Sequence, residues 1–353
     1  MKAAVWHGRK DVRVEEVPDP PPPPAGQLQI EVAWCGLCGT DLHEYLGGPL
    51  YIPAQAPHPL TGALAPVILG HELSGRVIAI GEGVTGFKVG DRVVACPIIG
   101  CLKCRWCKAG FMGQCENVAF LGISWHSGGF AQKANLHAYQ VYHLPDAVPD
   151  DVGALVEPWA AVVRMVARGE VGPEDNVAVI GAGPIGLMAT MAARIAGAKR
   201  IVSVELAERR IELARQCGAD ANINPKLEDP LARARELTYG NGFDVVLECA
   251  GQRATGLLAG RLTRIRGRLM VMGVFEEPAP FDYTDLVYGE KTVIGSMGGY
   301  GMFDEAIARL ADERFRGDII ITGKIHLDDI LDKGFRPLIE EKDRHVKILV
   351  SPR

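Results

Sequence analysis

Residues 177–186 read VAVIGAGPIG, and this stretch decides the fold of the chain. An apolar run leads directly into G-x-G-x-x-G, and a segment rich in alanine and methionine follows. A strand, a glycine turn and a helix in this order are the signature of a βαβ unit that binds a dinucleotide. The glycines permit a tight turn, close approach of the backbone to a pyrophosphate, and tight packing of helix on strand. The candidate cofactor-binding residues of this motif are Gly181, Gly183, Pro184, Ile185 and Gly186.

The acidic residue at the end of the next strand bears on which nicotinamide cofactor is used. The segment IVSVE ends at Glu205, 19 residues after Gly186. A carboxylate at this place accepts hydrogen bonds from the ribose hydroxyls and repels a 2'-phosphate, which favours NAD over NADP. Arg209 and Arg210 keep NADP open, because an arginine just after this strand can grip a phosphate or cover the adenine, and Arg210 is counted with the cofactor-binding residues. A glycine turn that serves packing alone is disfavoured, since strand, motif, helix and acid occur in order.

A change in the pattern of apolar segments near residue 153 predicts two domains in this chain of 353 residues. Residues 1 to about 150 hold alternating strand-like segments and are mostly β. Further on, VAVIG, IVSVE, FDVVLECA, RLMVMG and TVIGS alternate with helical segments, which specifies a parallel sheet covered on both faces. After about residue 290, a helix near 303–312 and strands at 324–327 and 346–350 indicate a return to the first domain. We predict a first domain at 1–154, a nucleotide-binding domain at 155–290, and the return at 291–353.

The composition argues against several classes of protein. Apolar residues make up 48% of the chain and charged residues 23%, as in a globular protein. The net charge of -5 argues against nucleic acid as a partner, because phosphates demand a basic surface. The start lacks the apolar run of a secretory signal, and the longest uncharged run, 176–193, contains the glycine motif, so we expect no membrane segment. Nine cysteines, four of them between 101 and 115, suit metal binding in a reducing compartment, and we expect a cytoplasmic protein.

Four closely spaced cysteines predict a structural zinc site. Cys101-x-x-Cys104-x-x-Cys107-x7-Cys115 supplies four thiolates on one lobe, at about 96–116, which is enough to close a tetrahedral site without water. Closed sites of this kind hold loops together and do not catalyse. A zinc ribbon that binds nucleic acid is the alternative, and the acidic balance of the chain disfavours it.

A second group of potential metal ligands begins in CGLCGTDLH, residues 35–43. Taken alone, its C-x-x-C is half of a structural zinc site, a redox pair or part of a catalytic site. Because the four-cysteine lobe completes itself, Cys35 and Cys38 need other partners, and His71 with Glu72 stands directly before a strand. A thiolate, an imidazole and a carboxylate leave a zinc position open for water or substrate, as a catalytic site requires. Glu157, at the entry to the second domain, is a further acid for the same metal.

The motifs GLCGTDLH, LGHE, the four-cysteine lobe and GAGPIG, in that order and spacing, resemble the zinc-dependent medium-chain dehydrogenases over essentially the whole chain. Longer strings, among them WHGRKDVRVE, IPAQAPHPLT and DDILDKGFRPLIEEK, are similar to the (R,R)-2,3-butanediol dehydrogenases of that family. The resemblance implies the α/β fold class, with a GroES-like, mostly-β catalytic domain built from both chain ends. A Rossmann domain with a doubly wound parallel sheet is inserted between them. A homodimer or homotetramer is the usual assembly.

The resemblance also implies roles for individual residues. The catalytic zinc ligands of the family fall on Cys38 and His71, while Glu72 and Glu157 fall where polyol-type members alternate a carboxylate ligand with a water-bridged one. Within residues 35–43, Thr40 matches the hydroxyl that hydrogen-bonds the substrate oxygen, and His43 matches the imidazole that passes its proton outward. Cys35 lies outside the ligand pattern of the family.

The sequence therefore predicts an NAD-dependent zinc alcohol dehydrogenase, with two zinc ions per subunit, one catalytic and one structural. The expected reaction is the reversible oxidation of (R,R)-2,3-butanediol to acetoin, so the partner is a small diol or hydroxyketone. A sorbitol or threonine dehydrogenase of the same family is the alternative substrate prediction. A zinc- and NAD(H)-binding sensor or scaffold without catalysis is the alternative of a different class.

Overall fold

The computed structural model describes all residues, 1–353, and divides them into two compact units. Unit 1 comprises Met1–Ala160, Gly298–Ile307 and Ile321–Arg353, and unit 2 comprises Ala161–Met297 and Ala308–Ile320. These bounds differ from the predicted ones at both junctions. The predicted return at 291–353 does not belong to one unit throughout, because 291–297 and 308–320 pack with the second unit.

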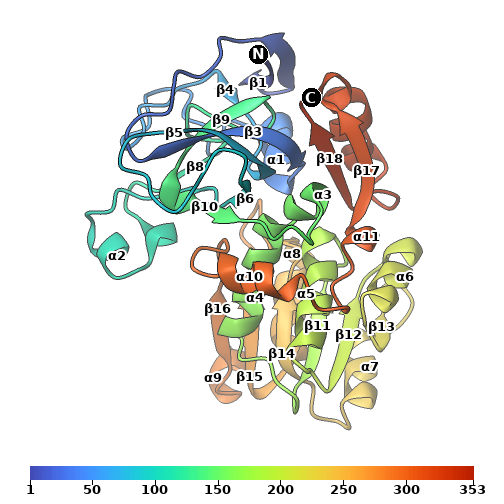
Figure 1. Cartoon of the computed structure of the whole chain (residues 1–353). Coiled ribbons are helices and arrows are strands. Elements are labelled where there is room, and N and C mark those ends of the chain that lie inside the picture. The colour runs from blue at the N-terminus through green and yellow to red at the C-terminus, as the bar shows by residue number, and fades with distance from the viewer. The chain divides into compact units, whose positions relative to one another are not determined.

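The strands of unit 1 come from both ends of the chain (Figure 1). They are β1 (Lys2–Gly8), β2 (Asp11–Glu16), β3 (Gln27–Gly36), β4 (Val67–Ile68), β5 (Glu72–Ile80), β6 (Arg92–Ala95), β7 (Ile98–Ile99), β8 (Ala119–Phe120), β9 (Lys133–His137), β10 (Val141–His143), β17 (Ile321–His326) and β18 (Lys347–Ser351). The helices that lie wholly in this unit are α1 (Gly39–Gly47), α2 (Arg105–Lys108), α3 (Asp150–Gly153), α12 (Arg336–Glu340), the 3-10 helices η1 (Met112–Gln114), η2 (Ala138–Gln140) and η3 (Leu327–Asp329), and the π-helix η4 (Ile330–Phe335).

A seven-stranded sheet with β3 near its middle organises unit 1. Its order is β10-β6-β5-β3-β18-β17, and β9 pairs with β3 as well. One of the alternating segments expected in residues 1 to about 150 is β3, whose inward side chains, such as Leu28 and Ile30, are fully buried. The C-terminal strand β18 runs antiparallel to β3, with Val350 opposite Cys35. This pairing brings the last residues of the chain beside the stretch 35–43.

Unit 2 is built on a parallel sheet of six strands in the order β13-β12-β11-β14-β15-β16. These strands are β11 (Asn176–Ile180), β12 (Arg200–Val204), β13 (Ala221–Ile223), β14 (Phe243–Glu248), β15 (Thr263–Val271) and β16 (Thr292–Gly295). Its helices are α5 (Pro184–Ile195), α6 (Glu208–Gln216), α7 (Pro230–Leu237), α8 (Arg253–Leu262) and α9 (Tyr283–Tyr288). Three further helices contain or adjoin the junctions between the units: α4 (Val156–Arg168), α10 (Phe303–Arg309) and α11 (Gly317–Ile320).

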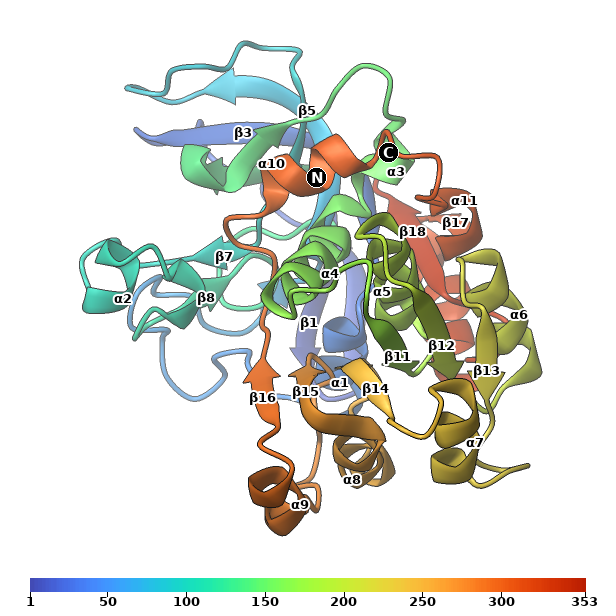
Figure 2. The same ribbon diagram turned by 90° about the horizontal axis from the view of Figure 1, so that it is seen from below.

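The predicted parallel sheet covered on both faces is confirmed, with α5 on one face and α7 and α8 on the other (Figure 2). The chain leaves β11 toward β12 and β13, and then crosses back to form β14 on the other side of β11. Because the strands are parallel, their carboxyl ends meet at one edge of the sheet, where open α/β sheets bind ligands. The reversal between β11 and β14 therefore marks the place for a dinucleotide.

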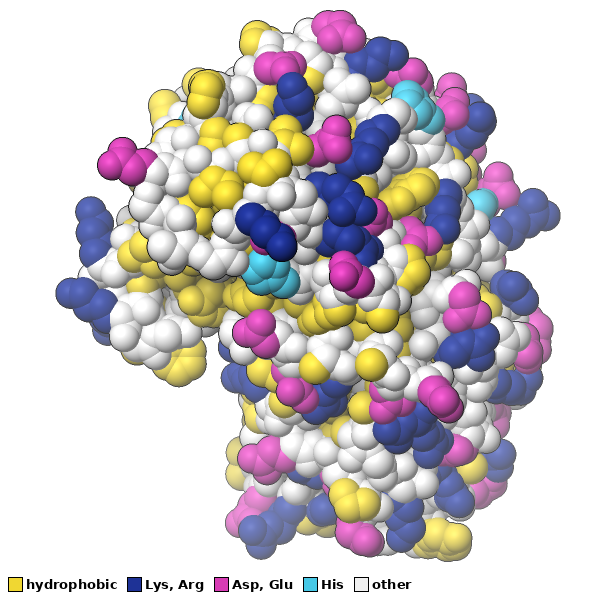
Figure 3. Space-filling view, viewed as in Figure 1, with side chains coloured by type: hydrophobic (Ala, Val, Ile, Leu, Met, Phe, Trp, Pro, Cys, Tyr) yellow, Lys and Arg dark blue, Asp and Glu magenta, His cyan; other side chains and the backbone are white.

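No helix combines the length and the apolar character needed to cross a membrane. On the face shown in Figure 3, lysine and arginine side chains are interspersed with aspartate and glutamate. This mixed surface agrees with the balanced composition.

Candidate metal and dinucleotide sites

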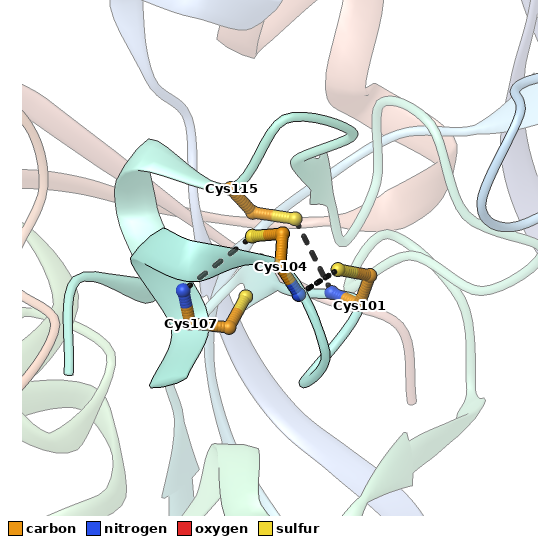
Figure 4. Close-up of side chains that lie close together, drawn as sticks. All are labelled: Cys101, Cys104, Cys107 and Cys115. Carbon is orange, nitrogen blue, oxygen red and sulfur yellow. Dashed lines mark hydrogen bonds between the residues drawn. The ribbon is translucent and has the colours of Figure 1, made fainter. Parts of the chain in front are cut away.

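The four cysteines of the lobe converge on one point (Figure 4). One sulfur from each of Cys101, Cys104, Cys107 and Cys115 lies within 4.8 Å of the others. Backbone N–H groups point at these sulfurs, with Cys101 N donating to Cys115 Sγ at 3.3 Å and Cys104 N to Cys101 Sγ at 3.3 Å. Such donors stabilise thiolates, which are the form that binds metal.

The pKa values of these thiols differ because their surroundings differ. The backbone N–H of Cys107 and neighbouring groups lower the pKa of Cys104 to about 6, whereas loss of solvent raises that of Cys107 to about 12. The cluster thus holds protons on some sulfurs and charge on others. A divalent ion bound by these four residues would replace those protons, and zinc suits a set of four thiolates.

A second convergence of ligand atoms joins Cys38, His71 and Glu72 in unit 1. One ligand atom from each lies within 4.8 Å of the others, and His71 and Glu72 are buried. The residues come from the start of α1 and from the start of β5 with its preceding turn, which the β3–β5 pairing holds together. A thiolate, an imidazole and a carboxylate form an open donor set, so this group fits a catalytic metal.

Helix α1 carries the other residues predicted beside Cys38. Cys38 is its N-cap, and Thr40 and His43 fall three positions apart on α1, which places them on one face of the helix. The Cys38 Sγ lies 3.7 Å from the Thr40 hydroxyl, and both Thr40 and His43 are partly buried. Cys35, in contrast, is a fully buried core residue of β3.

Asp41 is a site residue that the sequence reasoning quoted without giving it a role. Its Oδ2 accepts the Cys38 N–H at 2.9 Å and so caps α1, while its Oδ1 lies 3.8 Å from His71 Nδ1. Asp41 is fully buried, and neither Asp41 Oδ1 nor His71 Nδ1 has a hydrogen-bond partner. A carboxylate at the outer nitrogen of a metal-binding histidine fixes the orientation of its ring. The signal in the sequence was an acid at the third position of a helix, as in a capping box.

Lys347 is a second residue that the sequence reasoning missed. Its Nζ lies 2.7 Å from both carboxylate oxygens of Glu72 and donates to Leu37 O at 2.9 Å. The side chains are 3% and 1% exposed, so this is a buried ion pair. Gly36 makes room for it, because a Cβ there would lie 2.1 Å from Glu72 Oε2.

The charges around Cys38, His71 and Glu72 favour a cation. Burial lowers the pKa of His71, but the thiolate of Cys38 and the carboxylate of Asp41 outweigh it and leave that pKa well above its usual value. Glu157 is partly buried on α4, and loss of solvent raises its pKa to about 7. Its oxygens are not among the ligand atoms that converge within 4.8 Å. Protons on His71 and Glu157 therefore offset the negative charge of this site, and a bound metal ion would supply positive charge in their place.

The three glycines of the motif at 181–186, in unit 2, differ in their steric surroundings. Gly181 has a φ of +88°, and a Cβ on Gly186 would lie 1.7 Å from Gly181 O, so helix and strand pack closely. A Cβ on Gly183 would meet nothing within 4 Å, which leaves open space for a ligand against the backbone. Gly183 caps α5, and Pro184 stands at its first turn, where no intrahelical N–H bond is needed.

Glu205 lies directly beyond β12 and beside this motif. Its Oε2 accepts the Ala182 N–H at 2.8 Å, and its Oε1 accepts Leu206 N–H at 2.6 Å. The predicted neighbourhood of glycine turn and acid is thus present. Arg210, on α6, is partly buried.

Two family models of known proteins match this chain. Residues 24–146 match the family model described as alcohol dehydrogenase GroES-like domain, and 184–312 match the model described as zinc-binding dehydrogenase. The (R,R)-butanediol dehydrogenase of Bacillus subtilis (strain 168) is 41% identical over 352 residues, with 100% of each chain covered.

Solved structures of dehydrogenases are similar to this chain over nearly its whole length. The crystal structure of 2R,3R-butanediol dehydrogenase from Bacillus subtilis has a TM-score of 0.94 and 40% identity, covering 100% of this chain and 99% of that one. A zinc-binding dehydrogenase from Sinorhizobium meliloti 1021, bound to NADP, has a TM-score of 0.89 and 30% identity, covering 99% of each chain.

Proposed function

The chain belongs to the zinc-binding alcohol dehydrogenases, and from this premise we propose that it interconverts (R,R)-2,3-butanediol and acetoin with NAD as the hydride carrier. The family membership confirms the predicted resemblance and the predicted fold class of a GroES-like and a Rossmann domain. The observation that carries the proposed substrate is the 41% identity to a butanediol dehydrogenase over the full length of both chains.

Cys38, His71 and Glu72 are the proposed ligands of a catalytic zinc, with Glu157 as a second carboxylate nearby. A zinc ion held there supplies a Lewis acid that lowers the pKa of a substrate hydroxyl. The support is the convergence of the three donor atoms within 4.8 Å. Two charged residues position these ligands: Lys347 pairs with Glu72, and Asp41 lies beside His71.

Thr40 and His43 are the proposed path for the proton that leaves the substrate hydroxyl. Thr40 is supported by its hydroxyl, 3.7 Å from Cys38 Sγ, and His43 by its place one helical turn further along α1. An imidazole suits transfer to solvent because its two ring nitrogens can accept a proton on one side and donate one on the other.

The lobe of Cys101, Cys104, Cys107 and Cys115 is the proposed site of a second, structural zinc in each subunit. NAD is proposed in preference to NADP because of the Glu205 carboxylate beside the glycine motif. Because a relative was solved with NADP bound, the rates with NAD and with NADP are compared below.

A homodimer or homotetramer in the cytoplasm is the proposed state. Strand β16 is an edge of the parallel sheet with Val293 44% exposed, and an edge strand presents backbone groups that can pair with another chain. Light scattering after size exclusion measures the mass and tests this part alone.

The reaction is tested by initial rates with NAD and the three stereoisomers of 2,3-butanediol, beside sorbitol and threonine. We expect (R,R)-2,3-butanediol to give the highest kcat/KM, and NAD to exceed NADP. Preference for sorbitol or threonine would overturn the substrate and leave the metal chemistry standing. NADH binding without turnover of any alcohol would favour the sensor or scaffold.

A further inference from the structure

Glu248 is a buried carboxylate at the end of β14, and the proposed reaction gives it no role. It is fully buried, and its Oε1 accepts hydrogen bonds from Ala250 N at 3.1 Å, Gly251 N at 3.0 Å and Thr255 Oγ1 at 2.7 Å. Its Oε2 is buried and has no hydrogen-bond partner. A buried acceptor without a partner is costly, so its presence at this place needs an explanation.

Two loops close around this carboxylate. A Cβ on Gly273 would lie 2.3 Å from Gly251 N and 2.4 Å from Glu248 Oε2, and a Cβ on Gly251 would lie 2.5 Å from Val274 O. The backbone oxygen of Glu248 also accepts the N–H groups of Met272 and Gly273, at 3.0 and 3.1 Å. Glu248 thus fixes the segments that follow both β14 and β15.

These loops adjoin the dinucleotide motif on the side away from Glu205. Strand β14 neighbours β11, and β12 with Glu205 lies on the opposite side of β11. Cys249 N donates to Ile180 O at 3.0 Å, so the loop after β14 begins against the end of the strand that leads into the motif. With the pyrophosphate at the motif and the adenine ribose at Glu205, the other half of a dinucleotide extends over β14 and β15.

A second unpartnered polar group lies at the same edge of the sheet. Ser296, just beyond β16, is 7% exposed, and its hydroxyl has no hydrogen-bond partner. Its N–H donates to Val271 O at 2.9 Å, which ties it to the end of β15. Two buried polar atoms without partners, at the carboxyl ends of the two strands that flank β15, indicate a polar ligand there.

We propose that Glu248 positions the loops that receive the nicotinamide, and that its buried negative charge favours the oxidised, cationic nicotinamide over the reduced, neutral one. This inference rests on the proposed use of NAD. An attraction between opposite charges is strong where water is excluded, and only NAD+ carries the positive ring. Glu248 therefore acts on the balance between the two bound cofactor forms.

The test compares dissociation constants of NAD+, NADH and ADP-ribose for the metal-loaded protein and its Glu248→Gln variant, by calorimetry. Glutamine keeps the size and the Oε1 acceptor but removes the charge. We expect NAD+ to bind roughly tenfold more weakly to the variant, with NADH changed by less than about threefold. ADP-ribose lacks the nicotinamide and should bind the variant as it binds the unmodified protein. Glu236→Gln is the matched control, because that side chain is 65% exposed on α7.

Glu248→Asp separates charge from packing. It keeps the charge on a shorter side chain, so the ratio of the NAD+ and NADH constants should stay near that of the unmodified protein, even where both bind more weakly. This variant also decides the matter if glutamine prevents folding, since a ratio that collapses with aspartate overturns the proposal. An equal loss for NAD+ and NADH with glutamine, or no loss for either, overturns it as well. Failure of the unmodified protein to bind any of the three ligands would instead remove the proposed cofactor.

Discussion

Replacing Lys347 by methionine tests how the candidate metal site is held together. The lysine is 3% exposed and bonds both oxygens of Glu72, which is 1% exposed. Methionine fills a similar volume but leaves the carboxylate buried without its counter-ion. Removing one member of a buried ion pair costs roughly 3–5 kcal/mol. At roughly 2–4 °C per kcal/mol for a domain of this size, the melting temperature should fall by at least about 6 °C.

The same change should weaken metal binding. A group that orients a metal ligand from behind contributes about 10- to 100-fold to affinity, so the catalytic ion should be lost to a chelator at lower concentration. Melting by differential scanning calorimetry and metal content by mass spectrometry measure the two effects. Lys324→Met is the matched control, since Lys324 pairs with Asp151 but is 46% exposed, and it should cost about 0–1 kcal/mol.

A double variant checks the cause. If the cost arises from the stranded charge, then Glu72→Gln added to Lys347→Met should recover a large part of the lost stability, while activity stays low. Equal melting temperatures for Lys347→Met and Lys324→Met would refute the reasoning. So would a double variant that is less stable than either single one.

Three further changes probe other parts of the two metal sites. Cys104→Ser should release the lobe's metal and lower the melting temperature, with the metal count falling by one per subunit; an unchanged count and melting temperature would refute a structural zinc. Asp41→Asn should reduce zinc affinity about 10- to 100-fold in chelator competition, because the amide supports the His71 ring less well than a carboxylate; unaltered affinity would exclude this support. Zinc affinity at the catalytic site should fall as the pH is lowered from about 8 to about 6. Affinity falls with pH because the pKa values of His71 and Glu157 are raised, so the metal must displace protons that these groups keep up to higher pH. An affinity independent of pH would contradict this prediction.

Much of the fold was predictable because its signals are local. The alternation of short apolar strands with helices follows from residues near each other in the chain, and the parallel sheet confirms it. The glycine motif and Glu205 are likewise close in sequence, and a hydrogen bond from Ala182 N–H to Glu205 joins them. The domain junctions were predicted less well. Residues 308–320 pack with unit 2 although both flanking segments belong to unit 1, and local pattern carries no information about which unit a short helix joins.

The sequence by itself determined which residues are candidates for the two metal sites and for the dinucleotide turn, because zinc sites and phosphate loops need fixed residue types at short, fixed spacings. Only the tertiary structure decided what supports them. Lys347 and Glu72 are 275 residues apart and meet because β18 and β5 flank the same strand, β3. Asp41 faces His71, and Glu248 joins two loops, for the same reason: a buried charge takes its partner from whichever strand or helix the fold packs beside it, and no spacing in the sequence records that choice.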